Sequence, residues 1–120
     1  MSDGRAREWR FYLQDMIDFA EAVMAYTQGM TLETFVASEL HFDATVRKLE
    51  LIGEAATHVP AVVRDAHPEI PWRLVIAARN RLIHGYLGID NDTLWSMVRD
   101  DVPALLPKLR SILAVSPPPG

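Results

Sequence analysis

The chain has 120 residues, of which 49% are hydrophobic and 23% are charged, as is typical of one globular domain. It contains no cysteine, which excludes disulfides and thiolate metal sites. The net charge of −4 argues against a broad nucleic-acid-binding surface but is compatible with a small basic site. The first residues, MSDGRAREWR, are polar, and no apolar run is long enough to span a bilayer. We therefore expect a cytoplasmic protein with no membrane partner.

Apolar residues recur at helical spacing along the whole chain, and no stretch shows the period-two alternation of a β-strand. The spacing predicts a first helix over residues 7–27, which Gly29 ends. A short helix is predicted to begin at Thr31, with Phe35 pointing inward. The first part of the chain is therefore predicted to contain two helices joined by a turn at Gly29.

A third helix is predicted from about residue 39 to residue 58, where Pro60 stops it. Its residues Gly53, Ala55 and Ala56 are small, so another helix could approach closely there. The segment PAVVRDAHPEIP then predicts a connector with about one helical turn. Pro71 suits the first turn of a fourth helix, which we expect to end near residues 85–88.

A fifth helix is predicted after Asp90, Asn91 or Asp92, each of which could cap it. Pro103 lies inside this helix and should kink or break it. We expect an all-α, antiparallel bundle of four to five helices. The predicted domain spans residues 1–113, and a disordered tail follows over residues 114–120.

The segment ARNRLIHGY, residues 78–86, concentrates polar groups at the end of the fourth helix. Arg79 and Tyr86 are seven residues apart and share a stripe if the helix persists, while Asn80 and His84 share the neighbouring stripe. Arg79 and His84 come together only if the helix loosens, which Gly85 makes easy. No acid occurs between residues 71 and 86, so nothing nearby in the sequence neutralises the arginines.

These residue types suit a phosphodiester. A guanidinium binds phosphate oxygens through a planar fork, an imidazole can move a proton near neutral pH, and a phenol can donate a hydrogen bond or be modified. Each residue, taken singly, also has an ordinary structural interpretation, and the residues alone leave both open. No metal is implied, since the histidines lack a recognisable ligand spacing; they are His41, His58, His67 and His84.

The pattern Arg79-x4-His84-x-Tyr86 resembles the signature of the HEPN superfamily, and specifically of its HepT-like toxins. The blocks LELIGEAA, HPEIPW, RNRLIHGY and LWSMVRDDVPAL resemble HepT-like blocks in the same order. The resemblance covers nearly the whole chain, from about residue 12 to residue 113, with no departure at the motif positions.

The resemblance implies an all-α homodimer whose motif helices face each other, and metal-independent RNA cleavage with no cofactor. It implies Arg79 and His84 as catalytic residues. It also implies a partner, a nucleotidyltransferase antitoxin of the MNT type that transfers AMP to Tyr86. A dimer suits the chemistry, because two chains would supply both a base and an acid, and two Arg79 side chains would trap an anion between them.

Further polar residues are candidates for supporting roles. Glu54 could orient Arg79 or another motif group, or it could belong to an exposed stripe with Arg47, Glu50 and His58. Asn80 could orient His84, bond across the dimer or be solvated. Arg73 and Arg81 are candidate RNA-phosphate contacts, or solvated surface residues.

The leading hypothesis is therefore the toxin of a type VII-like toxin–antitoxin pair, an endoribonuclease that cleaves RNA such as tRNA or mRNA. The alternative is a non-catalytic helical adaptor that binds a nucleotidyltransferase or a nucleotide. The intact motif would serve both functions, so its spacing does not separate them.

Overall fold

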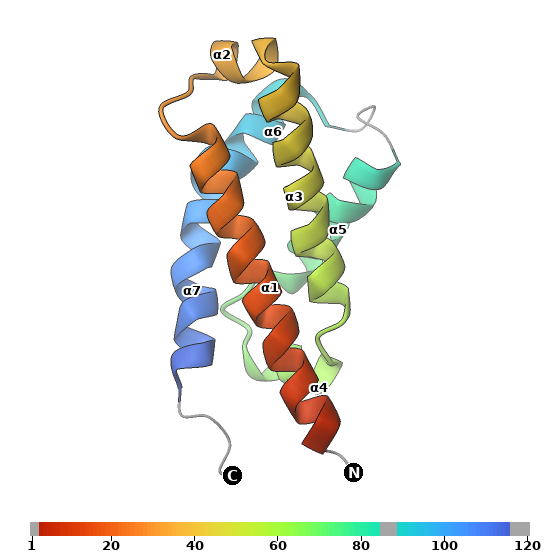
Figure 1. The fold of residues 1–120 in the computed structure, drawn as a ribbon. Helices are drawn as coiled ribbons and strands as arrows, with labels where there is room; N and C mark the ends of the chain where they lie inside the picture. The colour runs from red at the N-terminus through yellow and green to blue at the C-terminus, as the bar shows by residue number, and fades with distance from the viewer. Residues whose placement is uncertain (1–2, 85–88, 116–120) are drawn as a thin grey trace.

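Long helices form the frame of the molecule and shorter helical segments close its two ends (Figure 1). The computed structural model describes residues 3–84 and 89–115, and these residues make an all-α bundle measuring 49 × 27 × 22 Å, as predicted. The long helices are α1 (Asp3–Thr27), α3 (Glu39–Thr57), α5 (Trp72–Ile83) and α7 (Val102–Ala114). The shorter segments are α2 (Leu32–Ala37), α4 (Ala61–Ala66), α6 (Asn91–Ser96) and a π-helical turn (Met97–Asp101).

Helix α1 packs against α3 and α7, so segments from both ends of the described chain lie side by side (Figure 1). Its inner stripe is fully buried and has the three- and four-residue spacing that the sequence predicts; it comprises Leu13, Met16, Ala20 and Val23. Burial of a large apolar side chain contributes about 1.5–3 kcal/mol. Two polar contacts also join α1 to α7: Arg10 donates to the Leu113 carbonyl at 2.8 Å, and Arg110 pairs with Glu21 at 2.6 Å.

Capping residues begin the short helices where the sequence predicts them. Gly29 has a φ of 76°, the left-handed conformation that ends α1. The Thr31 hydroxyl accepts from the Thr34 N–H at 3.1 Å, and the Asp90 carboxylate accepts from the Thr93 N–H at 2.7 Å. These caps set α2 and α6 across the end of the bundle.

The Phe35 side chain of α2 is fully buried in an aromatic cluster at that end. Its ring centroid lies 5.3 Å from that of Phe42 and 5.0 Å from that of Trp95. The prediction that Phe35 points inward is therefore confirmed, and the cluster joins α2 to α3 and α6.

Pro103 divides the predicted fifth helix, as expected. Proline lacks the N–H that would bond to the carbonyl four residues earlier. The preceding turn adopts π-helical geometry, in which the Val102 N–H donates to the Met97 carbonyl. The predicted single helix is therefore α6, the π turn and α7 in succession.

The remaining differences in helix limits are small. Pro71 precedes the first residue of α5 instead of lying within its first turn, and His58 caps α3 instead of belonging to it. The predicted connector contains the six-residue helix α4. The predicted domain limits stay a prediction, and residues 116–120 of the tail lie outside the described part. None of the described helices has the length and apolar character needed to cross a membrane.

Candidate functional site

Helix α5 crosses α3 at a glycine. A Cβ placed on Gly53 would overlap the Cβ of Arg79, and would lie 2.9 Å from the Arg79 Cγ and 3.0 Å from the Val75 carbonyl oxygen. The predicted close approach of another helix at Gly53 is therefore confirmed, and that helix is α5. The crossing turns one face of α5 toward α3 and places the stem of Arg79 directly against the α3 backbone.

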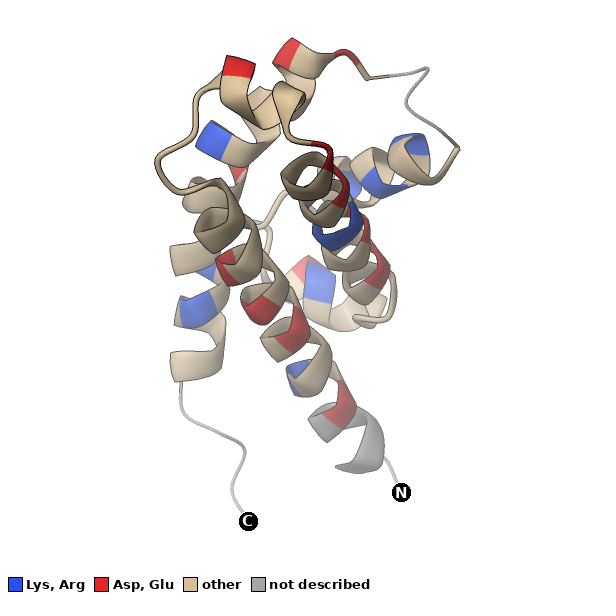
Figure 2. Cartoon of the chain, turned by 45° about the horizontal axis from the view of Figure 1, so that its top comes forward, with Lys and Arg blue, Asp and Glu red and all other residues tan. Residues whose placement is uncertain are grey.

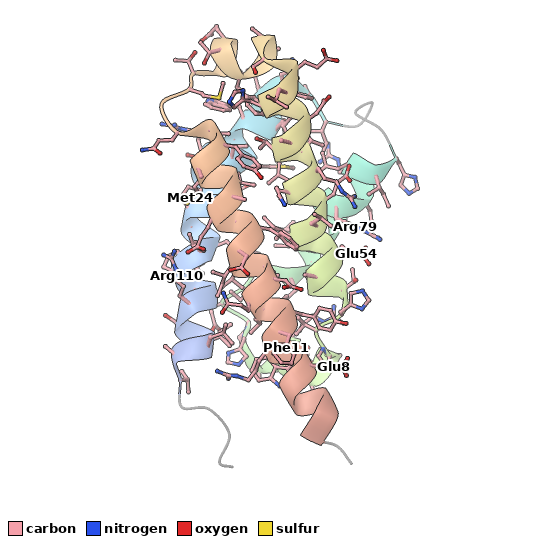
Figure 3. The ribbon with its side chains drawn as sticks, viewed as in Figure 1. Glu8, Phe11, Met24, Glu54, Arg79 and Arg110 are labelled. Carbon is pink, nitrogen blue, oxygen red and sulfur yellow. The ribbon has the colours of Figure 1, made fainter. Side chains whose placement is uncertain are left out.

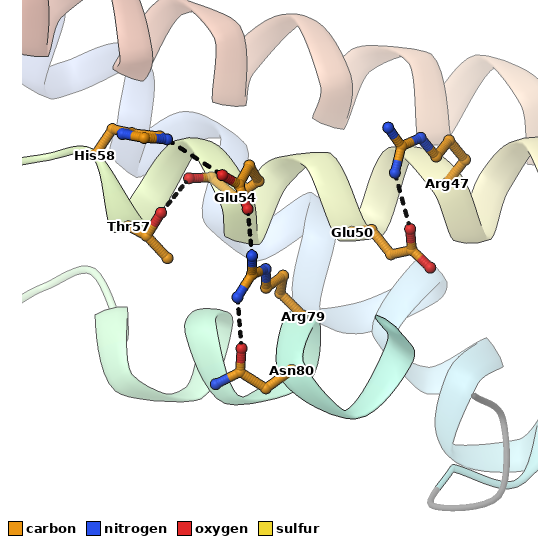
Figure 4. Close-up of polar contacts among 7 residues, drawn as sticks. All are labelled: Arg47, Glu50, Glu54, Thr57, His58, Arg79 and Asn80. Carbon is orange, nitrogen blue, oxygen red and sulfur yellow. Dashed lines mark hydrogen bonds and ion pairs between the residues drawn. The ribbon is translucent and has the colours of Figure 1, made fainter. Parts of the chain in front are cut away.

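Arg79 of α5 lies beside Glu54 of α3 (Figure 3). Its guanidinium is held between two acceptors (Figure 4). Its Nη2 donates to the Glu54 carboxylate at 2.5 Å, and its Nη1 donates to the Asn80 Oδ1 at 2.8 Å. The Arg79 side chain is 26% exposed and that of Glu54 is 43% exposed, so water reaches both. Because solvent screens such a pair, it contributes little to the stability of the fold. Its role is to orient the Arg79 side chain.

Glu54 therefore contacts Arg79, as one of the two interpretations of the sequence predicts. The other interpretation also describes the structure, because Glu54 lies on a stripe with ion pairs between Arg47 and Glu50 at 3.1 Å and between His58 and Glu54 at 3.2 Å (Figure 4). No acid near Arg79 in the sequence neutralises it, as expected, but the fold brings one to it from elsewhere. Its partner is on a different helix, 25 residues away in the sequence.

The Glu54 carboxyl has a pKa lowered from its ordinary value of 4.5, by the hydrogen bond from His58 and then by that from Arg79. A depressed pKa means that ionised Glu54 favours the folded state above pH 4.5, and that this contribution is lost as the pH falls through the folded-state pKa. The chain of contacts from His58 through Glu54 to Arg79 should therefore persist in mildly acidic solution.

Replacing His58 by alanine should raise the Glu54 pKa toward 4.5, because the largest cause of its depression is removed. Titration of the Glu54 side-chain carboxyl by NMR measures this shift. The control is His41→Ala, which removes an exposed histidine from the other end of α3. An unchanged midpoint in His58→Ala would contradict the assigned cause.

His84 lies at the end of α5, where its backbone has left helical geometry with a ψ of 14°. Its side chain is exposed, and it makes no hydrogen bond or ion pair with another described residue. The predicted loosening of the helix end is present, but Arg79 faces α3, and within one chain no hydrogen bond joins either Arg79 or Asn80 to His84. Asn80 instead supports Arg79, a role that the sequence did not suggest.

Two further arginines of α5 lie on different sides of it. Arg81 lines an apolar groove of about 360 Å³ between α5 and α7, together with Leu74 and Met97. Arg73 lines a separate cleft between α4 and α5. Helix α5 carries basic residues and no acid (Figure 2). The sequence pairs Arg73 with Arg81 as RNA contacts, but the structure separates them.

Some predicted site residues lie outside the described part of the chain, and one residue of the site region was not predicted. Tyr86 lies outside the described residues, as does Gly85. Within residues 3–84 and 89–115, no group of three His, Asp or Glu side chains could hold a metal ion. Arg64 of α4 also lines the cleft with Arg73, and it was not among the residues that the sequence pattern indicated. It lies in the predicted connector, where no motif or spacing indicated a binding role.

Comparison with known proteins agrees with the resemblance of the motif. Residues 16–112 match the family described as "Ribonuclease HepT-like". A protein of Thermococcus cleftensis named "Probable ribonuclease HepT" is 36% identical over 88% of this chain and 96% of its own length. A "Putative RNase" of Methanocaldococcus jannaschii is 34% identical over 82% of this chain and 91% of its own. A "Putative RNase" of Caldanaerobacter subterraneus is 32% identical over 87% of this chain and 93% of its own length. No solved structure matches the chain.

Proposed function

Since the chain belongs to the HepT-like ribonuclease family of the HEPN superfamily, we propose that it is a metal-independent endoribonuclease in which Arg79 and His84 are catalytic. One observation carries the proposal: α5 holds a guanidinium oriented by Glu54 and Asn80, and it ends in a histidine that is open to solvent. A fixed cation and an accessible imidazole carried by the same helix are suited to a phosphodiester.

The proposed reaction is attack of a ribose 2′-hydroxyl on the adjacent phosphorus. One His84 removes the hydroxyl proton as the new oxygen–phosphorus bond forms. The bond from phosphorus to the 5′-oxygen breaks, and that oxygen receives a proton from an acid. The products are a 2′,3′-cyclic phosphate and a 5′-hydroxyl. Arg79 stabilises the charge that develops on the non-bridging oxygens.

A homodimer would supply the acid, since each chain brings one His84 to its helix end. Helix α5 also exposes apolar side chains on more than one side, and a second copy would cover surface of this kind: Leu74 is 69% exposed and Ile83 is 46% exposed. In such a dimer Glu54 would offset the charge of each Arg79, so the two arginines would repel each other less than the sequence alone suggests.

The test is cleavage of total RNA by the purified protein in EDTA, after sedimentation has established its size. We expect a dimer at micromolar concentration and cleavage products that end in a cyclic phosphate. Cleavage that needs added divalent metal would contradict metal independence, and a monomer that cleaves would contradict the composite site. A folded dimer that leaves RNA intact would favour the adaptor function.

We further propose that the protein is a cytoplasmic toxin of a type VII-like pair, and that a cognate nucleotidyltransferase of the MNT type neutralises it by adding AMP to Tyr86. The resemblance of the motif supports this proposal. Tyr86 follows His84 by two residues, so one AMP would add negative charge and a bulky base beside the proposed site.

Replacing Tyr86 by phenylalanine removes the acceptor hydroxyl and retains the ring. After incubation with the nucleotidyltransferase and ATP, the wild type should gain one or more AMP units, and Tyr86→Phe should gain none. Intact-mass spectrometry measures the difference. Tyr26→Phe is the control, because that tyrosine is on α1, and it should be modified like the wild type. Equal modification of Tyr86→Phe would eliminate Tyr86 as the target.

A further inference from the structure

A second basic feature lies beside the proposed site, in the cleft of about 540 Å³ between α4 and α5. Arg64 and Asp65 of α4 form one wall, and Arg73 and Asn80 of α5 form the other. Ile76 contributes an apolar surface between them. The cleft is thus polar at its edges and apolar between them, with more positive than negative charge.

Arg64, which lines this cleft, has an unmatched side-chain donor. Its Nε is buried and has no hydrogen-bond partner. Neither Arg64 nor Arg73 forms an ion pair with a carboxylate of the described residues, even though Asp65 lines the same cleft. Buried donors in native proteins are nearly always satisfied. The Nε itself is closed to solvent, but the residue lines the cleft with a guanidinium charge that no described carboxylate neutralises, so the cleft suits an anionic ligand.

The position of the cleft connects it to His84. Arg73 and Asn80 are seven residues apart, and His84 follows Asn80 by four, so the three side chains lie along one face of α5. At a rise of 1.5 Å per residue, Arg73 and His84 are about 16 Å apart along the helix axis. An extended ligand that reaches His84 could therefore also occupy the cleft.

We infer that the cleft binds a backbone phosphate of single-stranded RNA, on the strand whose cleaved bond lies at His84. Arg64 and Arg73 bind the phosphate oxygens through their planar forks. Ile76 gives the adjoining nucleotide an apolar surface to contact. This inference rests on the proposed function and makes Arg64 and Arg73 substrate-positioning residues.

The experiment measures binding of a fluorescent single-stranded RNA by anisotropy at several salt concentrations, in a His84→Ala background that prevents cleavage. Each phosphate contact on a single strand contributes about 0.7 to the slope of log affinity against log salt. Arg64→Gln with Arg73→Gln should lower the slope by about 1.4 for each strand bound and weaken binding about tenfold at low salt.

The matched control is Arg47→Gln with Arg110→Gln, which removes the same charge from α3 and α7 and should retain the slope. Circular dichroism checks the folding of each variant. Arg73 is exposed, so Arg73→Gln alone should fold, and it should lower the slope by about 0.7. This single variant replaces the double variant in the test if the double variant does not fold.

The outcomes separate this inference from the proposed function. A cleft variant that binds RNA with the slope of the control overturns the inference, even where the wild type cleaves RNA. If that variant instead loses only its association with the nucleotidyltransferase, the cleft is a partner surface and the inference is also wrong. Cleft-dependent RNA binding by a protein that does not cleave RNA supports the inference and overturns the proposed ribonuclease activity. Absence of any RNA binding overturns both.

Discussion

His84→Ala should cleave RNA about 100- to 10,000-fold more slowly than the wild type, which is the usual contribution of a positioned acid or base. Folding should be retained, because the side chain is exposed at the end of α5 and makes no hydrogen bond, ion pair or ring contact with a described residue that truncation would remove. The initial rate of RNA cleavage in EDTA measures the first effect, and circular dichroism measures the second.

Two controls make this result specific. His41→Ala removes an exposed histidine at the far end of α3 and should cleave at the wild-type rate. Arg79→Ala should also lose cleavage and remain folded, since its ion pair with Glu54 is open to solvent. A His84→Ala variant that cleaves normally, or that is inactive only because it has unfolded, would remove the catalytic assignment.

Gly53→Ala should both destabilise the fold and reduce cleavage. In an isolated helix this change would be favourable by about 1 kcal/mol. Here the added methyl group overlaps the Arg79 Cβ and approaches the Val75 carbonyl, so α3 and α5 must move apart. Overpacking of this kind costs about 1–3 kcal/mol, and we expect a net loss of stability. The displacement also separates Arg79 from Glu54.

Urea unfolding measures the stability change, and the EDTA assay measures cleavage. The control is Glu50→Ala, about one turn earlier in α3, which should change the free energy of unfolding by less than about 0.5 kcal/mol and leave cleavage intact. A Gly53→Ala variant that is more stable than the wild type and fully active would show that the close approach of α5 is unnecessary.

Local signals predicted most of the fold. The apolar spacing of α1, the turn at Gly29, the cap at Thr31 and the break before Pro103 each depend on a few neighbouring residues, and each is present in the structure. The sequence also identified Gly53 as a place of close approach. These features were accessible because backbone conformation and helix periodicity act over short distances.

The contacts of the site were less accessible to sequence reasoning. Glu54 and Arg79 were both candidates, but their pairing depends on where α5 crosses α3, which neither helix specifies alone. The same crossing makes Asn80 a partner of Arg79. Arg64 was missed because its cleft forms only when α4 folds back beside α5. The catalytic roles of Arg79 and His84 stay predictions.

The pairing of α1 with α7 has a consequence for the order of events during synthesis. Arg10 and Leu113, which join these helices, are 103 residues apart. At about 5–20 residues per second, the ribosome makes the second about 5–20 seconds after the first. Until then α1 can pack against α3 but has no α7, so one side of its apolar stripe stays uncovered. The nascent chain is therefore open to chaperones for most of its translation, and the finished bundle closes only after α7 has emerged.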